Sequence, residues 1–374
     1  MSAPLVDPSP ERLDALRLVL IPGVGPLTRR ALIEHLGDPT SVLNSTREQL
    51  LLVPGIGTKL AQRILVARRE IDVNEELDVC QAHGLRIILE CDSEYPERLR
   101  QIPDPPGALF ISGRLLAQDV LAVAIVGTRH ATHYGLQTAE RLAGSLVKAG
   151  YTVVSGLARG IDAAAHRGAL SAGGRTIAVL GSGILNLYPP EHTQLAADVQ
   201  ANGAVLSEAP PRMPASGGMF PQRNRVITGL SLGTIVVEAA ERSGALVSAT
   251  HAMEQGREVF AVPGRIDSRM SRGCHQLLRD GATLVESIDD VLEQLGPLTD
   301  IAKLADGREV RHAAELQLNP LEQRVLAAID QEATGIEAVV VRSGLAVHRV
   351  LATLTVLEMR RLIRRPSGSM VCRV

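Results

Sequence analysis

The 374-residue sequence has no tryptophan, 3 phenylalanines and 4 tyrosines. Aromatic side chains are the stacking platforms of many proteins that bind unpaired nucleic-acid bases. A site that stacks several bases is therefore disfavoured, and a nucleic-acid ligand would have to be held mainly through its phosphates. Phe220 and Tyr188 fall beside a candidate groove, whereas Phe110 and Phe260 lie in strand-like apolar runs and are expected in the core.

Metal-binding and disulfide-rich classes are also disfavoured. Cys80, Cys91, Cys274 and Cys372 show none of the close pairs that zinc sites or disulfide frameworks require. The sequence has no Walker lysine motif, no histidines at metal-ligand spacing and no recognisable Ser-His-Asp set. We therefore expect neither a metal nor a cofactor.

Long apolar runs and a strong net charge are absent as well. No run approaches the roughly 18 residues that a membrane helix needs, and the first residues, which include Asp7 and Glu11, lack a basic-then-apolar signal pattern. We expect a cytoplasmic protein with no membrane partner. The formal net charge is -2 and the pI about 6.6, so nucleic-acid binding would need a local basic patch.

The first pattern that is present is an internal repeat. Residues 21–25 (Ile-Pro-Gly-Val-Gly) recur as residues 53–57 (Val-Pro-Gly-Ile-Gly), and each copy precedes a helical pattern, at 27–36 and 59–69. This is the signature of a helix-hairpin-helix, whose glycine turn lets backbone amides approach a phosphate. Two copies predict an all-α unit, assigned to residues 1–79. Its hairpins either bind nucleic acid or serve only as a scaffold.

A parallel α/β sheet is predicted for residues 80–297. Buried strands at 120–126, 152–155 and 176–180 alternate with helical patterns, and a further strand follows at 234–237. The first three strands end in small-residue turns, which are Gly127-Thr128-Arg129, the run from Gly156 to Asp162, and Gly181-Ser182-Gly183. Ligands bind at the edge where parallel strands end. We therefore expect a Rossmann-like doubly wound parallel sheet with an anion site at these turns.

Four arginines converge on the same edge in this arrangement. Arg129 and Arg159 lie in the first two turns, and Arg223 and Arg225 lie in a stretch that we interpret as a basic loop before the later strand. One glycine-rich turn is weak evidence, since glycine is often needed only to turn the chain. Three such turns beside four arginines predict a phosphate-bearing ligand.

The end of the chain predicts a separate unit. Residues 298–318 lack a firm pattern and are interpreted as a linker. Asn319-Pro320 then starts three helical patterns, at 321–330, 336–342 and 347–360, which two short strands follow. This order predicts a winged helix over residues 319–374. The unit carries eight arginines against five acidic residues, and a DNA-binding and a protein-docking role both stay open.

Between about residues 80 and 295 the sequence resembles the DNA-processing protein A family (DprA, also called Smf). The motifs that carry the resemblance occur in order and are Tyr95-Pro96, Asp104-Pro105-Pro106, Val126-Gly127-Thr128-Arg129, Ser155-Gly156-Leu157-Ala158-Arg159-Gly160-Ile161-Asp162, Gly181-Ser182-Gly183, Tyr188-Pro189, Leu206-Ser207-Glu208, Phe220-Pro221, Arg223-Asn224-Arg225 and Val262-Pro263-Gly264.

The resemblance implies a non-enzymatic recombination mediator. Such a protein is a cytoplasmic homodimer that binds single-stranded DNA, helps to load the RecA recombinase past single-strand-binding protein and supports natural transformation. The DNA-binding residues that we predict from the motifs are Gly127, Thr128, Arg129, Ser155, Gly156, Arg159, Gly160, Gly181, Ser182, Gly183, Phe220, Arg223, Asn224 and Arg225. The sequence departs from the family at Leu185, where members often have Asp, and at Pro190, where some members have a DNA-contacting Lys, so a basic contact beside Tyr188 is not expected.

A second resemblance gives the alternative function. The run Gly229-Leu230-Ser231-Leu232-Gly233-Thr234 with Glu238 resembles the glycine-rich turn and Glu of lysine-decarboxylase-like nucleotide phosphoribohydrolases. In those enzymes an Arg and a Glu act on a nucleoside monophosphate, and Arg225 with Glu238 would form that pair. Glu238 is otherwise explained as a carboxylate at a helix N-terminus, and His166 as a packed histidine rather than a general base.

Overall fold

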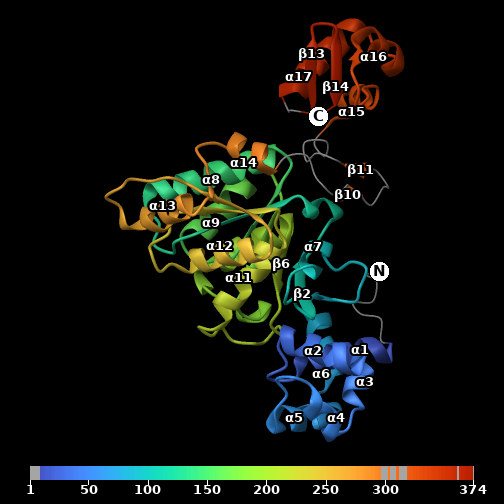
Figure 1. Cartoon of the computed structure of the whole chain (residues 1–374), viewed down its shortest axis with the longest axis vertical. Coiled ribbons are helices and arrows are strands. Elements are labelled where there is room, and N and C mark those ends of the chain that lie inside the picture. Colours follow the sequence, from blue (N-terminus) through green and yellow to red (C-terminus); the bar gives the residue numbers. More distant parts are fainter. Residues whose placement is uncertain (1–8, 296–301, 304–308, 311–317, 360–361, 374) are drawn as a thin grey trace.

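A computed structural model describes residues 9–295, 302–303, 309–310, 318–359 and 362–373. Figure 1 shows a helical N-terminal unit, a central α/β unit and a small C-terminal unit placed along the long axis of the molecule. The predicted fold class, a Rossmann-like unit between a helix-hairpin-helix unit and a winged helix, is confirmed.

The N-terminal unit is made of short helices. They are α1 (Pro10–Leu20), α2 (Pro26–Leu36), α3 (Pro39–Leu43), α4 (Arg47–Leu52), α5 (Thr58–Glu70) and α6 (Val73–Ala82). The repeated turns join α1 to α2 and α4 to α5. Their apolar residues Ile21, Val24, Val53 and Ile56 are buried together in one cluster, so the two hairpins form a single core.

The central sheet has the strand order β1-β2-β6-β5-β4-β3-β7-β8-β9 among the described residues. The strands are β1 (Arg86–Leu89), β2 (Ala108–Gly113), β3 (Ala122–Gly127), β4 (Thr152–Ser155), β5 (Thr176–Leu180), β6 (Ala204–Ser207), β7 (Gly233–Val237), β8 (Glu258–Ala261) and β9 (Thr283–Leu284). The neighbours from β6 to β9 pair in parallel, whereas β1 and β2 extend the sheet as antiparallel strands.

Helices cover both faces of the sheet because its inner strands are apolar on both sides. On β3, Ala122 and Ala124 point into one core while Val123 and Ile125 point into the other. The helices of the central unit are α7 (Glu97–Arg100), α8 (His133–Lys148), α9 (Ile161–Ser171), α10 (Thr193–Asn202), α11 (Met219–Gly229), α12 (Gly244–Glu254), α13 (Arg272–Arg279) and α14 (Ile288–Leu295). Helices α8, α9 and α14 pack on one face, and α11, α12 and α13 pack on the other.

The N-terminal unit and the central sheet share a core. Leu16 of α1 and Val73 of α6 are buried in one cluster with Ile87 of β1 and Phe110 of β2. These helices cover one face of the antiparallel extension, whose other face packs into the main core of the sheet. The boundary assigned at residues 79–80 therefore runs through this shared cluster, while the two hairpins also have a cluster of their own.

The C-terminal unit has the helix and strand order of a winged helix. It contains α15 (Pro320–Ala327), β12 (Thr334–Gly335), α16 (Ile336–Ser343), α17 (Val347–Met359), β13 (Ile363–Ser367) and β14 (Met370–Arg373). Within the stretch interpreted as a linker, β10 (Ala302–Lys303) pairs with β11 (Glu309–Val310), while most of the other residues of that stretch lie outside the described ones.

Across the described parts of the chain, no single helix is long and apolar enough to cross a membrane. The pair Ile336–Ser343 and Val347–Glu358 meets the length and composition criteria only when the two helices are joined across a 110° bend.

Candidate functional site

The turns after β3, β4 and β5 meet at one edge of the sheet, as predicted. These strands are adjacent and parallel, so Gly127, which ends β3, lies at the same end as Gly156 and Gly181, which follow β4 and β5. A Cβ atom on Gly156 would lie 1.6 Å from Arg223 Nη1, and one on Gly181 would lie 2.8 Å from Phe220 Cδ1. Glycine is therefore needed for the close packing of α11 on these turns, whether or not a ligand binds.

Two exposed arginines and two aromatic rings form a continuous strip at this edge. Arg129 Cζ lies 5.0 Å from the Phe220 ring centroid, and the ring centroids of Phe220 and Tyr188 are 5.6 Å apart. Arg159 Cζ lies 5.9 Å from the Tyr188 ring centroid. Cations at both ends can attract phosphates, and the partly exposed rings between them can contact bases. We call these four residues the arginine–aromatic strip.

Arg159 already has an anionic partner within the chain. Its Nε donates a hydrogen bond to Glu191 Oε1, and the two side chains are 49% and 47% exposed. This hydrogen bond holds the pKa of Glu191 below its ordinary value. Glu191 is therefore ionised at neutral pH and competes with a phosphate for Arg159.

Arg223 lies on a helix, so the prediction of a basic loop at this point was wrong. Helix α11 spans Met219–Gly229 and tolerates Pro221 because the amides of a first helical turn need no helical partner. The Arg223 side chain is buried and its Nη1 donates to Val179 O at 2.6 Å, beneath Gly156. Burial lowers the pKa of Arg223 to about 10. Arg223 supports the edge from below rather than projecting from it.

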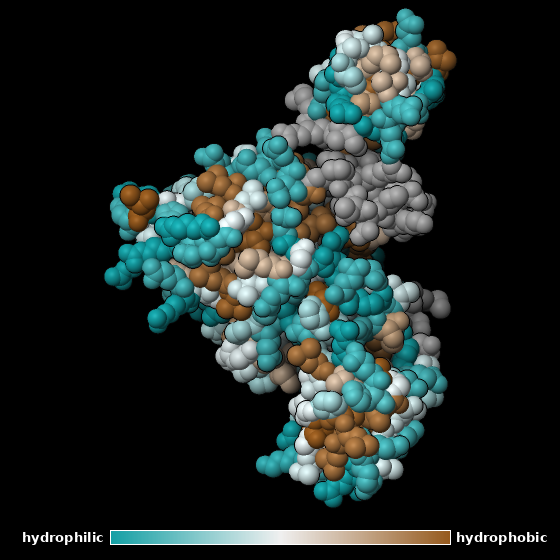
Figure 2. Space-filling view, in the orientation of Figure 1, coloured by the Kyte–Doolittle hydropathy of each residue, from teal (hydrophilic) through white to brown (hydrophobic). Residues whose placement is uncertain are grey.

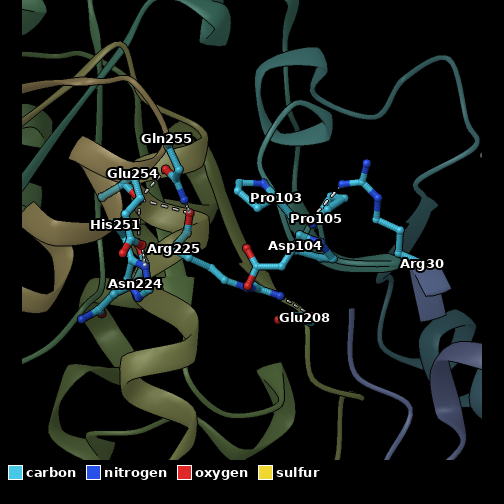
Figure 3. A network of polar contacts seen from close by, with 12 residues as sticks. Arg30, Pro103, Asp104, Pro105, Glu208, Asn224, Arg225, His251, Glu254 and Gln255 are labelled. Carbon is cyan, nitrogen blue, oxygen red and sulfur yellow. Dashed lines mark hydrogen bonds and ion pairs between the residues drawn. The ribbon is translucent and has the colours of Figure 1, made fainter. Parts of the chain in front are cut away.

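Arg225 is also buried and lies between two carboxylates (Figure 3). Its Nε donates to Asp104 Oδ2 at 2.7 Å and its Nη2 to Glu208 Oε1 at 2.8 Å. The neighbouring Asn224 donates through Nδ2 to Gly244 O at 3.2 Å. Asp104 lies in a loop whose other side contacts the N-terminal unit, where Arg30 donates to Pro103 O at 3.2 Å (Figure 3). Arg225 thus ties α11 to the segment at residues 103–106 and to the residue that follows β6.

Several amides of the predicted anion-binding turns have partners within the protein. Asp162 Oδ2 accepts from the amides of Gly156 and Ala158 at 3.2 and 3.4 Å. The amide of Gly183 donates to Met213 O at 2.8 Å. These amides are therefore not available to a phosphate in this conformation, and Arg129 and Arg159 provide the exposed positive charge at the edge.

The remaining predicted residues line the same turns but are mostly enclosed. Thr128, Ser155 and Ser182 are buried, and Ser155 Oγ donates to Ile125 O at 2.6 Å. A Cβ atom on Gly127, Gly160 or Gly183 would come within 2.0 to 2.3 Å of a backbone carbonyl oxygen. These residues shape the edge, and their contact with a ligand stays a prediction.

Glu238 occupies the N-terminus of α8. Its Oε2 accepts the Thr132 amide at 2.8 Å, its Oε1 accepts the Thr132 hydroxyl, and the side chain is buried against Gly135. A carboxylate is stabilised there by the helix dipole. Arg225 pairs with Asp104 and Glu208 instead of Glu238. The pair that the phosphoribohydrolase alternative needs is not assembled.

His166 is packed inside the protein, in agreement with its interpretation as a packed histidine. It is 0% exposed, and its Nδ1 lies 2.7 Å from Thr176 Oγ1. Burial lowers the pKa of His166 to about 3, so the ring is neutral at physiological pH.

Asp162 and Glu191 act at the site although the sequence analysis did not assign them to it. Asp162 is the second residue of α9 and lies in its first turn after a glycine, which is a common position for a carboxylate, so this signal was available. Glu191 lies in a short 3-10 turn after Tyr188, and nothing in the local pattern indicates that it faces Arg159.

Family models match all three units. The model described as DNA recombination-mediator protein A matches residues 86–296, the DprA winged helix domain matches residues 309–369, and the SAM-like helix-hairpin-helix tandem matches residues 15–70.

Curated relatives and solved structures agree with these matches. Protein Smf from Synechocystis is 34% identical over 93% of this chain and 95% of its own length, and protein Smf from Escherichia coli is 41% identical over 76% of both. The crystal structure of DNA processing protein A from Streptococcus pneumoniae aligns with a TM-score of 0.66 and 33% identity over 75% of this chain and 97% of that one. The chain therefore belongs to the DprA/Smf family of DNA recombination-mediator proteins.

Proposed function

We propose that this chain binds single-stranded DNA along the arginine–aromatic strip. The observation that carries the proposal is the order of the strip, in which two rings lie between two exposed arginines. A flexible single strand can place phosphates on the cations and bases on the rings at the same time. The proposal is supported by a family member, DNA processing protein A from Helicobacter pylori, which has a described single-stranded DNA binding mode and aligns with a TM-score of 0.51 at 30% identity over 56% of this chain and 95% of that one.

Within the predicted DNA-binding set, we divide the roles by exposure. Arg129, Arg159 and Phe220 contact the strand, together with Tyr188. The buried arginines of α11 and the glycines of the turns hold these side chains in place. Because few rings are present, affinity comes mainly from phosphates and depends little on base sequence.

On this basis the chain acts as a recombination mediator without catalysis. It works as a cytoplasmic homodimer, helps RecA to load on single strands covered by single-strand-binding protein, and takes part in natural transformation. The enclosed position of Glu238 supports a role without turnover, since its carboxylate oxygens accept hydrogen bonds from Thr132.

The binding proposal is tested by measuring oligonucleotide affinity at several salt concentrations. We expect Arg129→Ala to weaken binding and to reduce the slope of log K against log salt by about 0.7, the value for one lost phosphate contact on a single strand. Arg279→Ala, an exposed arginine of α13 outside the strip, is the matched control. A wild-type protein that ignores single strands, or an Arg129→Ala slope equal to that of wild type, would refute the proposed site.

The mediator role needs a separate assay. RecA nucleation is followed by ATP hydrolysis on single strands that already carry single-strand-binding protein. Wild-type chain should shorten the lag, and Arg129→Ala should not. An unchanged lag with a protein that binds DNA well would exclude the mediator role while leaving the binding site intact.

A further inference from the structure

A groove of about 830 Å³ runs between the first helix-hairpin-helix turn and the central unit. One wall is formed by residues 19–29, and the other by the loops after β5 and β6 together with α11. Gly181 and Arg223 line the groove and also lie under the strip, where Phe220 packs on Gly181. The groove is therefore continuous with the proposed path of the DNA.

The lips of the groove are apolar and exposed. Leu27 at the start of α2 is 64% exposed, and Met213 on the opposite wall is 41% exposed. Pro22, Pro210 and Pro221 line the same groove. Figure 2 shows brown, apolar side chains over the N-terminal unit at the lower end of the molecule, so exposed apolar surface is present on this unit. Such walls suit a flat, weakly hydrated ligand better than a phosphate.

The two carboxylates of the groove also disfavour a phosphate beside them, although Arg29 and Arg223 add positive charge elsewhere in the lining. Asp104 and Glu208 both line the groove, and their side chains are 31% and 30% exposed. Arg225 pairs with both, which leaves a formal excess of one negative charge in this group. An anionic backbone is repelled there, whereas a neutral nucleobase is not.

Three buried arginines behind the groove wall each leave one donor unused. Arg29, Arg223 and Arg225 line the groove and are 91% or more buried, and each has one side-chain nitrogen without a hydrogen-bond partner. The nitrogens are Nε of Arg29, Nε of Arg223 and Nη1 of Arg225. Unpaired buried donors are costly, so a shift of these guanidinium groups toward a neutral acceptor in the groove, such as a carbonyl oxygen or ring nitrogen of a base, would be favoured.

The wall formed by residues 19–29 is held in place by contacts to the central unit and to the second hairpin. Arg29 forms an ion pair with Glu90, and Arg30 donates to Pro103 O at 3.2 Å. Arg63 of the second hairpin donates to Pro22 O at 2.9 Å. The first hairpin is therefore fixed against the central unit, and the second hairpin turn does not line the groove.

We propose that this groove receives an unstacked nucleobase of the bound strand, with the first helix-hairpin-helix turn as one of its walls. The inference rests on the proposed function and adds to it a base-binding subsite that joins the N-terminal unit to the DNA path. It also provides apolar contact area for a base in a chain that has few aromatic residues.

The test compares a thymine oligonucleotide with an abasic oligonucleotide of equal length, using the full chain. Leu27→Gln and Met213→Gln change opposite lips of the groove without changing charge. We expect each to weaken thymine-strand binding about three- to tenfold, as for partial loss of one base contact. Binding of the abasic strand and the salt slope should stay as in wild type, because the phosphates are untouched.

The matched control is Leu52→Gln, since Leu52 is 80% exposed on the same unit and does not line the groove. It should bind both strands as wild type does. The inference is overturned if both lip variants bind the thymine strand like wild type, or if they weaken both strands equally, while Arg129→Ala still loses affinity. Wild-type protein that binds neither strand would instead overturn the proposed function, and the inference with it.

Discussion

Removal of the buried guanidinium of Arg225 should destabilise the central unit strongly. Its side chain is 5% exposed and pairs with Asp104 and Glu208 at 2.7 and 2.8 Å. Breaking a fully buried ion pair by removing one partner costs about 3 to 5 kcal/mol. Because both carboxylates are about one-third exposed, water can solvate them in part, and we expect about 2 to 3 kcal/mol for Arg225→Met. This corresponds to a fall in Tm of roughly 4 to 12 °C for a domain of this size.

The assay is urea and thermal unfolding of the full chain, followed by far-UV circular dichroism. The informative comparison is the triple variant Arg225→Met with Asp104→Asn and Glu208→Gln, which removes the uncompensated carboxylates. We expect the triple variant to be more stable than Arg225→Met alone, since replacing a whole ionic network costs less than leaving half of it. Arg272→Met, from the exposed pair with Glu241, should change little. A triple variant less stable than the single one, or a single variant as stable as wild type, would refute this account of Arg225.

Three other substitutions test the remaining parts of the site. Glu191→Gln frees an arginine of the strip and should tighten single-stranded DNA binding about two- to fivefold with a steeper salt slope, measured by fluorescence anisotropy; unchanged affinity would contradict the competition. Gly156→Ala places a Cβ 1.6 Å from Arg223 Nη1 and should lower the unfolding free energy by about 1 to 3 kcal/mol, whereas Gly217→Ala, which has open space, should not. Burial lowers the pKa of His166 from 6.5 to about 3, so unfolding takes up a proton between these two pH values, and the unfolding free energy should fall by about 1.4 kcal/mol per pH unit as the pH drops through this range. His166→Gln should remove this contribution, as measured by urea unfolding at several pH values. An unaltered pH slope would contradict the buried neutral ring.

The positions of strands and turns were predictable because they depend on local pattern. The strands at 152–155 and 176–180 match β4 and β5 residue for residue, and the repeated Pro-Gly turns lie between helices as predicted. In an α/β chain, short apolar runs bounded by glycine favour buried strands over helices or loops. The helices α10 and α13 were not predicted. Helix α10 has little amphipathic periodicity, whereas the apolar residues of α13 lie on one face but the helix spans only residues 272–279.

The environment of individual side chains was less predictable because it depends on residues far apart in the sequence. Arg225 meets Asp104 across 121 positions, so a local reading of Arg223-Asn224-Arg225 could only suggest an exposed basic segment. The sequence does contain the partners, but only the fold shows that they are adjacent. Conversely, the strip needs Tyr188 of the connection after β5 to meet Phe220 at the start of α11, and only their nearness to a candidate groove could be stated beforehand.

The common core of α1, α6, β1 and β2 bears on how this architecture can be divided. A shortened protein that begins after residue 79 would lose Leu16 and Val73. The side chains of Phe110 and Ile87, which pack against them, would then be exposed to solvent. Bare apolar strand faces at the rim of a sheet promote self-association. The N-terminal helices therefore cannot be removed without exposing apolar surface of the central sheet. A relative without these helices would need polar residues on this face of β1 and β2. A truncated form of this protein would need the same substitutions to stay monodisperse.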